Sequence, residues 1–143
     1  MQVEKAIANG YPLEAIALLD SMITDRLEAY YTKAYNSKEI SFLTLDKSIK
    51  ILEGDIQTIN GKLGKGNLNI VQIPQDLKNI IPSLKKFTHL RNETLHEFMK
   101  IEEGKIMSWS RRCQNARKAA KEGMSLFKKI NTLIQKFQRG TIK

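Results

Sequence analysis

Apolar residues return every three or four positions along most of this chain, which is the spacing of an amphipathic α-helix and not the alternation of a strand. In the first long segment this stripe contains Leu13, Ile16, Leu19, Ile23, Leu27, Tyr30 and Tyr31. A second stripe, in which steps of four and three alternate, contains Leu45, Ile49, Leu52, Ile56 and Ile59. This alternation is typical of helices packed nearly parallel to a neighbour, so the pattern predicts an all-α protein.

The breaks in the pattern predict the boundaries of four long helices. They are expected at residues 12–35, 42–60, 74–103 and 107–138, the third with a kink at Pro82, because proline removes a helical hydrogen bond. A short additional turn is expected at the N-terminus. The 143 residues are enough for one domain, so the whole chain is predicted to form a single four-to-five-helix up-and-down bundle.

The composition argues against several classes of site. The chain has one cysteine, Cys113, and two histidines, so neither an internal disulfide nor a Cys/His metal cluster is expected, and no cofactor is predicted. Cys113 falls within the apolar stripe of the last predicted helix, where it is expected to be a small buried side chain. No stretch approaches 18 consecutive apolar residues and the N-terminus lacks a secretory signal, which predicts a soluble cytoplasmic protein.

The net charge of +9 is concentrated toward the C-terminal end of the sequence. Residues 108–143 contain ten Lys or Arg residues and one acidic residue, Glu122, whereas the charges of residues 1–107 balance. A polyanion such as RNA, or an acidic protein, is the expected partner of such a segment. The side chains predicted to contact RNA are Arg111, Arg112, Arg117, Lys118, Lys121, Lys128 and Lys129. The alternatives are a solvated helix face that improves solubility and a helix that docks on anionic membrane, although its apolar stripe is needed to close the bundle.

An arginine lies in the apolar stripe of the third predicted helix. At about 100° per residue, Arg91 falls near the middle of the arc formed by Leu77, Ile80, Ile81, Leu84, Phe87, Leu95 and Phe98. A guanidinium in an apolar face is energetically costly unless a carboxylate or another anion meets it. Asp20 interrupts the stripe of the first helix in the same way, so a buried Asp20–Arg91 ion pair is one explanation.

The other explanation is that Arg91 and His96 line a cleft between helices or between subunits. There an arginine neutralises a phosphate, and a histidine accepts or donates a proton. The two explanations are compatible, because Asp20 would then orient the arginine.

The run Arg91-Asn92-x3-His96 resembles the Rx4–6H motif of the HEPN superfamily, in which a polar residue follows the arginine. Proteins of this superfamily are compact α-helical bundles that carry the motif on a late helix. The resemblance implies a metal-independent endoribonuclease, frequently a toxin of a toxin–antitoxin pair or a phage-defence effector, that acts as a homodimer with the active site at its interface. By the same resemblance His96 would transfer protons, Arg91 would stabilise the charged transition state and Asn92 would support the geometry of the motif. The implied products are a 2′,3′-cyclic phosphate and a 5′-hydroxyl.

One position departs from the pattern of HEPN toxins that pair with nucleotidyltransferase antitoxins. In those toxins the motif commonly continues to a tyrosine two residues after the histidine, and the antitoxin modifies that tyrosine. This chain has Phe98 there, so an antitoxin of that type would find no hydroxyl to modify. His89 lies outside the motif and is expected at the surface. The alternative function is a non-catalytic helical bundle that binds nucleic acid or an acidic antitoxin and uses Arg91 only structurally.

Overall fold

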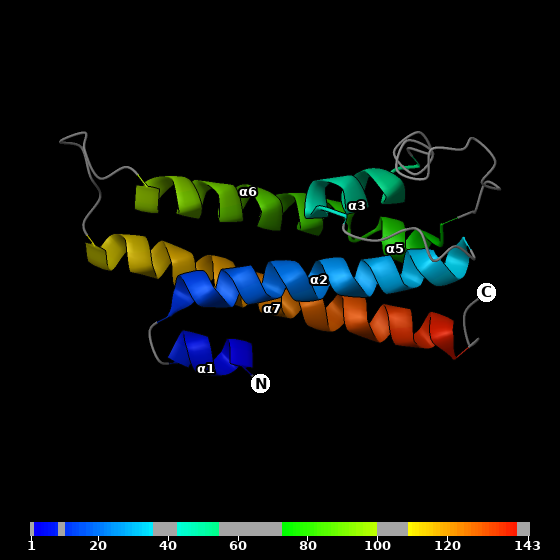
Figure 1. The fold of residues 1–143 in the computed structure, drawn as a ribbon, viewed down its shortest axis with the longest axis horizontal. Helices are drawn as coiled ribbons and strands as arrows, with labels where there is room; N and C mark the ends of the chain where they lie inside the picture. The colour runs from blue at the N-terminus through cyan, green and yellow to red at the C-terminus, as the bar shows by residue number, and fades with distance from the viewer. Residues whose placement is uncertain (1, 9–10, 36–42, 55–72, 100–108, 140–143) are drawn as a thin grey trace.

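The structure, a computed structural model, describes residues 2–8, 11–35, 43–54, 73–99 and 109–139 (Figure 1). Within these residues the secondary structure is entirely helical, which confirms the all-α prediction. The helices are α1 (Gln2–Ala8), α2 (Pro12–Ala34), α3 (Leu45–Leu52), α5 (Gln75–Lys78), α6 (Ile81–Met99) and α7 (Trp109–Gln138). None of these described helices has the length and apolar character needed to cross a membrane.

The long helices α2, α6 and α7 form the body of the bundle. α7 packs along both α2 and α6, and α1 packs against α2. α2 and α7 run in the same direction, whereas α6 runs in the opposite one (Figure 1). α1 also runs opposite to α2 and α7, so α1, α2, α6 and α7 alternate in direction along the described chain (Figure 1). The predicted bundle of helices is thus confirmed, but the helix expected over residues 42–60 is the eight-residue α3 in the described part of the chain, and the long helices α2 and α7 are parallel.

The helix predicted over residues 42–60 is shorter in the structure. α3 begins after Thr44, whose hydroxyl accepts a hydrogen bond from the Lys47 N–H at 3.3 Å and so caps the first turn. After the last residue of α3 the chain turns at Gly54, whose φ of 91° lies in the left-handed region that favours glycine. The rest of the predicted helix, residues 55–60, lies outside the described part of the chain.

The helix predicted over residues 74–103 is interrupted before Pro82 and not kinked at it. α5 ends at Lys78, two turn residues follow, and α6 begins at Ile81. Pro82 is thus the second residue of α6, a position whose N–H would have no helical partner in any case. The proline therefore stands at the start of a helix. Residues 100–103 lie outside the described part of the chain.

The core lies between α2, α6 and α7 and is extended by α1 and α3. Its fully buried large side chains include Ile16, Leu19, Ile23, Leu27, Leu45, Leu52, Leu77, Leu84 and Phe87. Tyr31 joins α2 to α3, because its buried hydroxyl donates a hydrogen bond to the carbonyl oxygen of Ser48 at 2.6 Å. The same burial raises the pKa of Tyr31 well above its ordinary value.

Gly123 determines how closely α7 approaches its neighbours. A Cβ atom at this position would lie 2.4 Å from Cε1 of Phe87 on α6 and 3.0 Å from Cδ1 of Leu19 on α2. Phe87 and Leu19 are themselves fully buried, so neither has free space into which it can move. A side chain at Gly123 therefore requires the helices to separate.

Gly123→Ala is expected to lower the free energy of unfolding by roughly 1–2 kcal/mol, because overpacking costs more than the helix propensity of alanine returns. Chemical denaturation followed by circular dichroism measures the change. Gln135→Ala, at an exposed position of the same helix, is the control and should be neutral or slightly stabilising. A Gly123→Ala protein as stable as the wild type would show that overpacking costs no more than the helix propensity of alanine returns.

Candidate functional site

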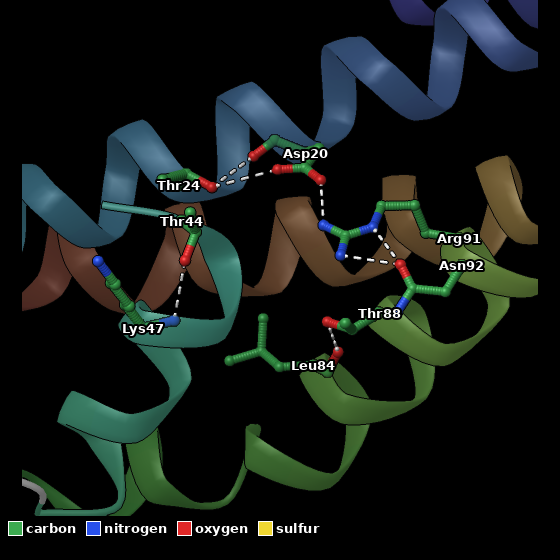
Figure 2. A network of polar contacts seen from close by, with 8 residues as sticks. All are labelled: Asp20, Thr24, Thr44, Lys47, Leu84, Thr88, Arg91 and Asn92. Atoms are coloured by element: carbon green, nitrogen blue, oxygen red, sulfur yellow. Dashed lines mark hydrogen bonds and ion pairs between the residues drawn. The ribbon is translucent and has the colours of Figure 1, made fainter. Parts of the chain in front are cut away.

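The two charged residues that interrupt apolar stripes meet between α2 and α6. Asp20 lies on α2 and Arg91 on α6, and Nη1 of Arg91 donates a hydrogen bond to Oδ2 of Asp20 (Figure 2). Both side chains are largely enclosed, with 15% of Arg91 and 29% of Asp20 exposed. Asp20 therefore supplies the anion that a guanidinium at the edge of a core requires.

Asn92 holds the other side of the guanidinium. Its Oδ1 accepts hydrogen bonds from Nε of Arg91 at 3.2 Å and from Nη2 at 3.0 Å. Asp20 and Asn92 together use three of the five N–H groups of the guanidinium. One N–H on Nη1 and one on Nη2 have no partner among the described residues, so a guanidinium fixed from two sides retains two donors for an anion such as phosphate.

Two threonines lie beside this ion pair on the same two helices. Thr24, one turn after Asp20, donates to the carbonyl oxygen of Asp20 at 2.7 Å and lies 3.4 Å from its Oδ1. Thr88 is buried one turn before Arg91 and donates to the carbonyl oxygen of Leu84 at 3.0 Å. Neither threonine was predicted from the sequence. The sequence does contain a signal for them. Each threonine lies three or four residues from a charged residue that interrupts an apolar stripe, which places the threonine and that charge on the same face of a helix.

The C-terminal half of α6 has a flank that no described helix covers. The apolar spacing predicts a buried Leu95, but this prediction is wrong: 42% of Leu95 is exposed, and Thr94 is buried instead. The short α3 packs against α6 only near the start of α6, where Nζ of Lys85 lies 3.0 Å from Oε2 of Glu53 (Figure 1). α7 continues along α6, so the residues that face α7 stay buried while those on the α3 side become exposed.

This open flank, defined by Asn92, Leu95 and His96, carries the second half of the motif. All three residues are exposed. His96 makes no hydrogen bond or ion pair with another described residue, and none joins it to Arg91. The structure thus brings Asp20, Arg91 and Asn92 together at the edge of the core and leaves His96 on the exposed surface, one turn after Asn92.

His89, the other histidine of α6, is exposed as predicted. Its Nε2 lies 2.9 Å from Oε1 of Glu93, four residues later, which is an ordinary surface pair along a helix. His89 therefore provides an exposed imidazole of the same helix with which His96 can be compared.

The basic residues predicted to contact RNA lie on the exposed surface of α7, with one exception. The exposed ones are Arg111, Arg117, Lys118, Lys121, Lys128 and Lys129. Arg112 is half-buried, because it lies one turn before Ala116 and so falls on the buried face of the helix. Cys113, predicted to be buried, is also half-buried.

Two adjoining cavities lie between α7 and the segment formed by α5 and α6. They measure about 540 Å³ and about 240 Å³, and Ser125 and Lys129 of α7 line both of them. Lys129 was predicted from the sequence, but Asn79 and Lys86, which line the facing walls, were not. No local pattern marks those two residues, because the walls come from segments far apart in the sequence.

Among the described residues, no group of three or more His, Cys, Asp or Glu side chains is placed to hold a metal ion. Comparisons of the chain with known protein families, with curated proteins and with solved structures find no match.

Proposed function

We propose that this chain is an endoribonuclease of the HEPN type that cleaves RNA without a metal ion and acts as a toxin or phage-defence effector. The observation that carries the proposal is the guanidinium of Arg91, which Asp20 and Asn92 fix in place while two of its N–H groups stay unused by described residues. An arginine held in this way is prepared to bind a phosphate without rearranging. The exposed His96, one turn after Asn92, completes the motif.

The proposed reaction uses the 2′-hydroxyl of the RNA as its nucleophile. This oxygen attacks the adjacent phosphorus, a bond forms between O2′ and phosphorus, and the bond from phosphorus to O5′ breaks. His96 removes the proton of the 2′-hydroxyl or delivers a proton to the departing O5′, since an imidazole does either near neutral pH. The two unused N–H groups of Arg91 bind the non-bridging phosphate oxygens, where negative charge grows in the transition state.

A second copy of the chain supplies the remaining acid or base. One imidazole acts either as the base or as the acid in this step, so the proposed enzyme is a homodimer that brings two His96 side chains to one phosphate. Leu95 lies on the same exposed flank between Asn92 and His96, so the proposed interface would cover it.

The Asp20–Arg91 ion pair also favours a second candidate, a non-catalytic bundle that binds nucleic acid or an acidic antitoxin. The carboxylate already neutralises the guanidinium, so Arg91 contributes to the fold whether or not it also binds phosphate. The exposed basic residues of α7 would then bind the partner through its negative charges. This candidate predicts RNA binding without cleavage.

Incubation of the purified protein with single-stranded RNA in the presence of EDTA tests the proposal. We expect fragments that end in a 2′,3′-cyclic phosphate, which mass spectrometry distinguishes from a linear phosphate by the mass of one water. DNA of the same sequence is the control and should stay intact, because it lacks the 2′-hydroxyl. RNA that binds to the protein and stays intact would support the non-catalytic bundle.

A further inference from the structure

We propose that the groove between α7 and the α5–α6 segment binds the sugar–phosphate backbone of single-stranded RNA, at a distance from the residues proposed to cut it. The groove consists of the two adjoining cavities of about 540 Å³ and 240 Å³. This inference rests on the proposed function for the identity of its ligand, and on the side chains of the groove for the chemistry of binding.

Lys129 is the central residue of the groove. It lines both cavities, it is exposed, and its ammonium group makes no hydrogen bond or ion pair with another described residue. A cation without a partner in a concave site attracts an anion more strongly than one on a convex surface, because neighbouring groups contact the same ligand.

Neutral donors lie beside Lys129. Ser125, one turn earlier on α7, lines both cavities. Asn79, at the turn between α5 and α6, lines the larger cavity, and its Oδ1 accepts a hydrogen bond from Nε2 of Gln75 at 2.9 Å. That bond leaves the NH₂ group of Asn79 as a donor. Lysine, serine and asparagine donors of this kind make many of the protein contacts to nucleic-acid phosphates.

The charge of the groove is positive on balance. The charged residues that line it are Lys86, Lys128, Lys129, Lys136, Asp76 and Glu122. Two of the lysines have acidic partners: Nζ of Lys86 lies 3.5 Å from Oε1 of Glu122, and Nζ of Lys128 lies 3.7 Å from Oε1 of Glu4. Lys129 thus stands out as the lysine that no described side chain neutralises.

The length and charge of the groove suit a phosphate backbone. It follows α7 from Glu122 to Lys136, which is about 21 Å at 1.5 Å per residue. A nucleic-acid strand that rises 3.4 Å per nucleotide places about six phosphates along this length. Apolar side chains such as Ile80 and Leu133 also line the larger cavity, so the positive lining and the shared Lys129, rather than a polar surface throughout, favour an anion as the ligand.

The groove and His96 lie toward different ends of α6. Lys86, which lines the smaller cavity, precedes His96 by ten residues, or about 15 Å along the helix axis. An RNA that contacts both sites on one chain must therefore extend over about five nucleotides. The groove consequently contributes to the binding of longer RNA and not to the chemical step, so its loss raises KM and leaves kcat unchanged.

Fluorescence anisotropy with a labelled single-stranded RNA of about ten nucleotides tests the groove, in His96→Ala protein so that the RNA stays intact. In this background Lys129→Ala should weaken binding about tenfold and lower the slope of log affinity against log salt by about one. Lys50→Ala, an exposed lysine of α3 outside both cavities, is the matched control and should change neither. Asp76→Asn removes an acid from the groove and should tighten binding.

Cleavage kinetics separate a failure of this inference from a failure of the proposed function. In a protein that cuts RNA, Lys129→Ala should raise KM for the longer RNA and leave cleavage of a dinucleotide unchanged. Unchanged binding in Lys129→Ala, or an equal loss in Lys118→Ala, would overturn the groove while leaving the nuclease in place. If the wild type binds RNA without cutting it, and Lys129→Ala weakens that binding, the groove proposal stands and the nuclease proposal fails. Stronger competition by poly-glutamate than by RNA, or no RNA binding at all, would also overturn the groove.

Discussion

His96→Ala is expected to reduce the rate of RNA cleavage by at least about 100-fold, because a general acid or base typically contributes 100- to 10,000-fold. The fold should stay unchanged, since His96 is exposed and makes no hydrogen bond or ion pair with another described residue. The measurement is kcat on a single-stranded RNA. Circular dichroism and the melting temperature of the same preparation check that the helices are intact.

His89→Ala is the matched control for this experiment. His89 is also an exposed histidine of α6, but its partner is Glu93 and it lies outside the motif. We expect His89→Ala to cleave RNA at the wild-type rate. If His96→Ala also cleaves at that rate, the imidazole of His96 takes no part in the chemistry and the proposed nuclease mechanism is wrong.

Separating Asp20 from Arg91 is expected to destabilise the fold. Asp20→Ala and Arg91→Ala should each lower the free energy of unfolding by about 2–3 kcal/mol, because each leaves a largely enclosed charge without its partner. The double variant should lose about 1–2 kcal/mol less than the sum of the single losses, which is the coupling energy of the pair. Urea denaturation of the wild type and the three variants measures these quantities. Strictly additive losses would mean that the ion pair contributes nothing to stability.

Arg91→Lys distinguishes the structural role of this arginine from a catalytic one. Lysine keeps the positive charge near Asp20, but it lacks the planar guanidinium that donates to Asp20, Asn92 and a phosphate in one fixed geometry. We expect Arg91→Lys to lose less stability than Arg91→Ala. We expect its rate of RNA cleavage to fall nearly as far as that of Arg91→Ala. Cleavage that falls only in proportion to stability would show that Arg91 serves the fold alone.

The ion pair between Asp20 and Arg91 is the part of the site that sequence reasoning reaches most directly. A charge inside an apolar stripe must find an opposite charge or an anion when the stripe is buried, and each of two helices has one such residue. The structure joins the two. The long helices are predictable for a related reason, because their stripes bury the residues that the spacing selects, such as Leu19 and Leu84.

The exposure of Leu95 and the parallel course of α2 and α7 are not predictable from the same spacing. A stripe defines which face of a helix is apolar, but it does not determine how long the neighbouring helix is. The steps from Leu45 to Ile59 indicate an uninterrupted helix, yet α3 ends at Leu52, before the turn at Gly54. The end of α3 lies beside the start of α6, where Glu53 pairs with Lys85, so α3 leaves the later flank of α6 open.

The groove could not be predicted from the sequence, because its two walls come from segments that lie side by side only in the folded chain. The contact of Gly123 with Phe87 sets the separation of α6 and α7, and that separation brings Asn79 and Lys86 opposite Lys129. No single segment carries this information.

The parallel course of α2 and α7 brings two like helix poles together. The rings of Tyr30 and Phe137, near the C-terminal ends of the two helices, have centroids 5.8 Å apart, so these ends lie side by side. Each carries a partial negative charge of about half an elementary charge from its aligned peptide dipoles, and the two repel. Lys33 and Lys136 lie in the last turns of α2 and α7 and offset this repulsion. These two lysines therefore stabilise the bundle whether or not a polyanion is bound.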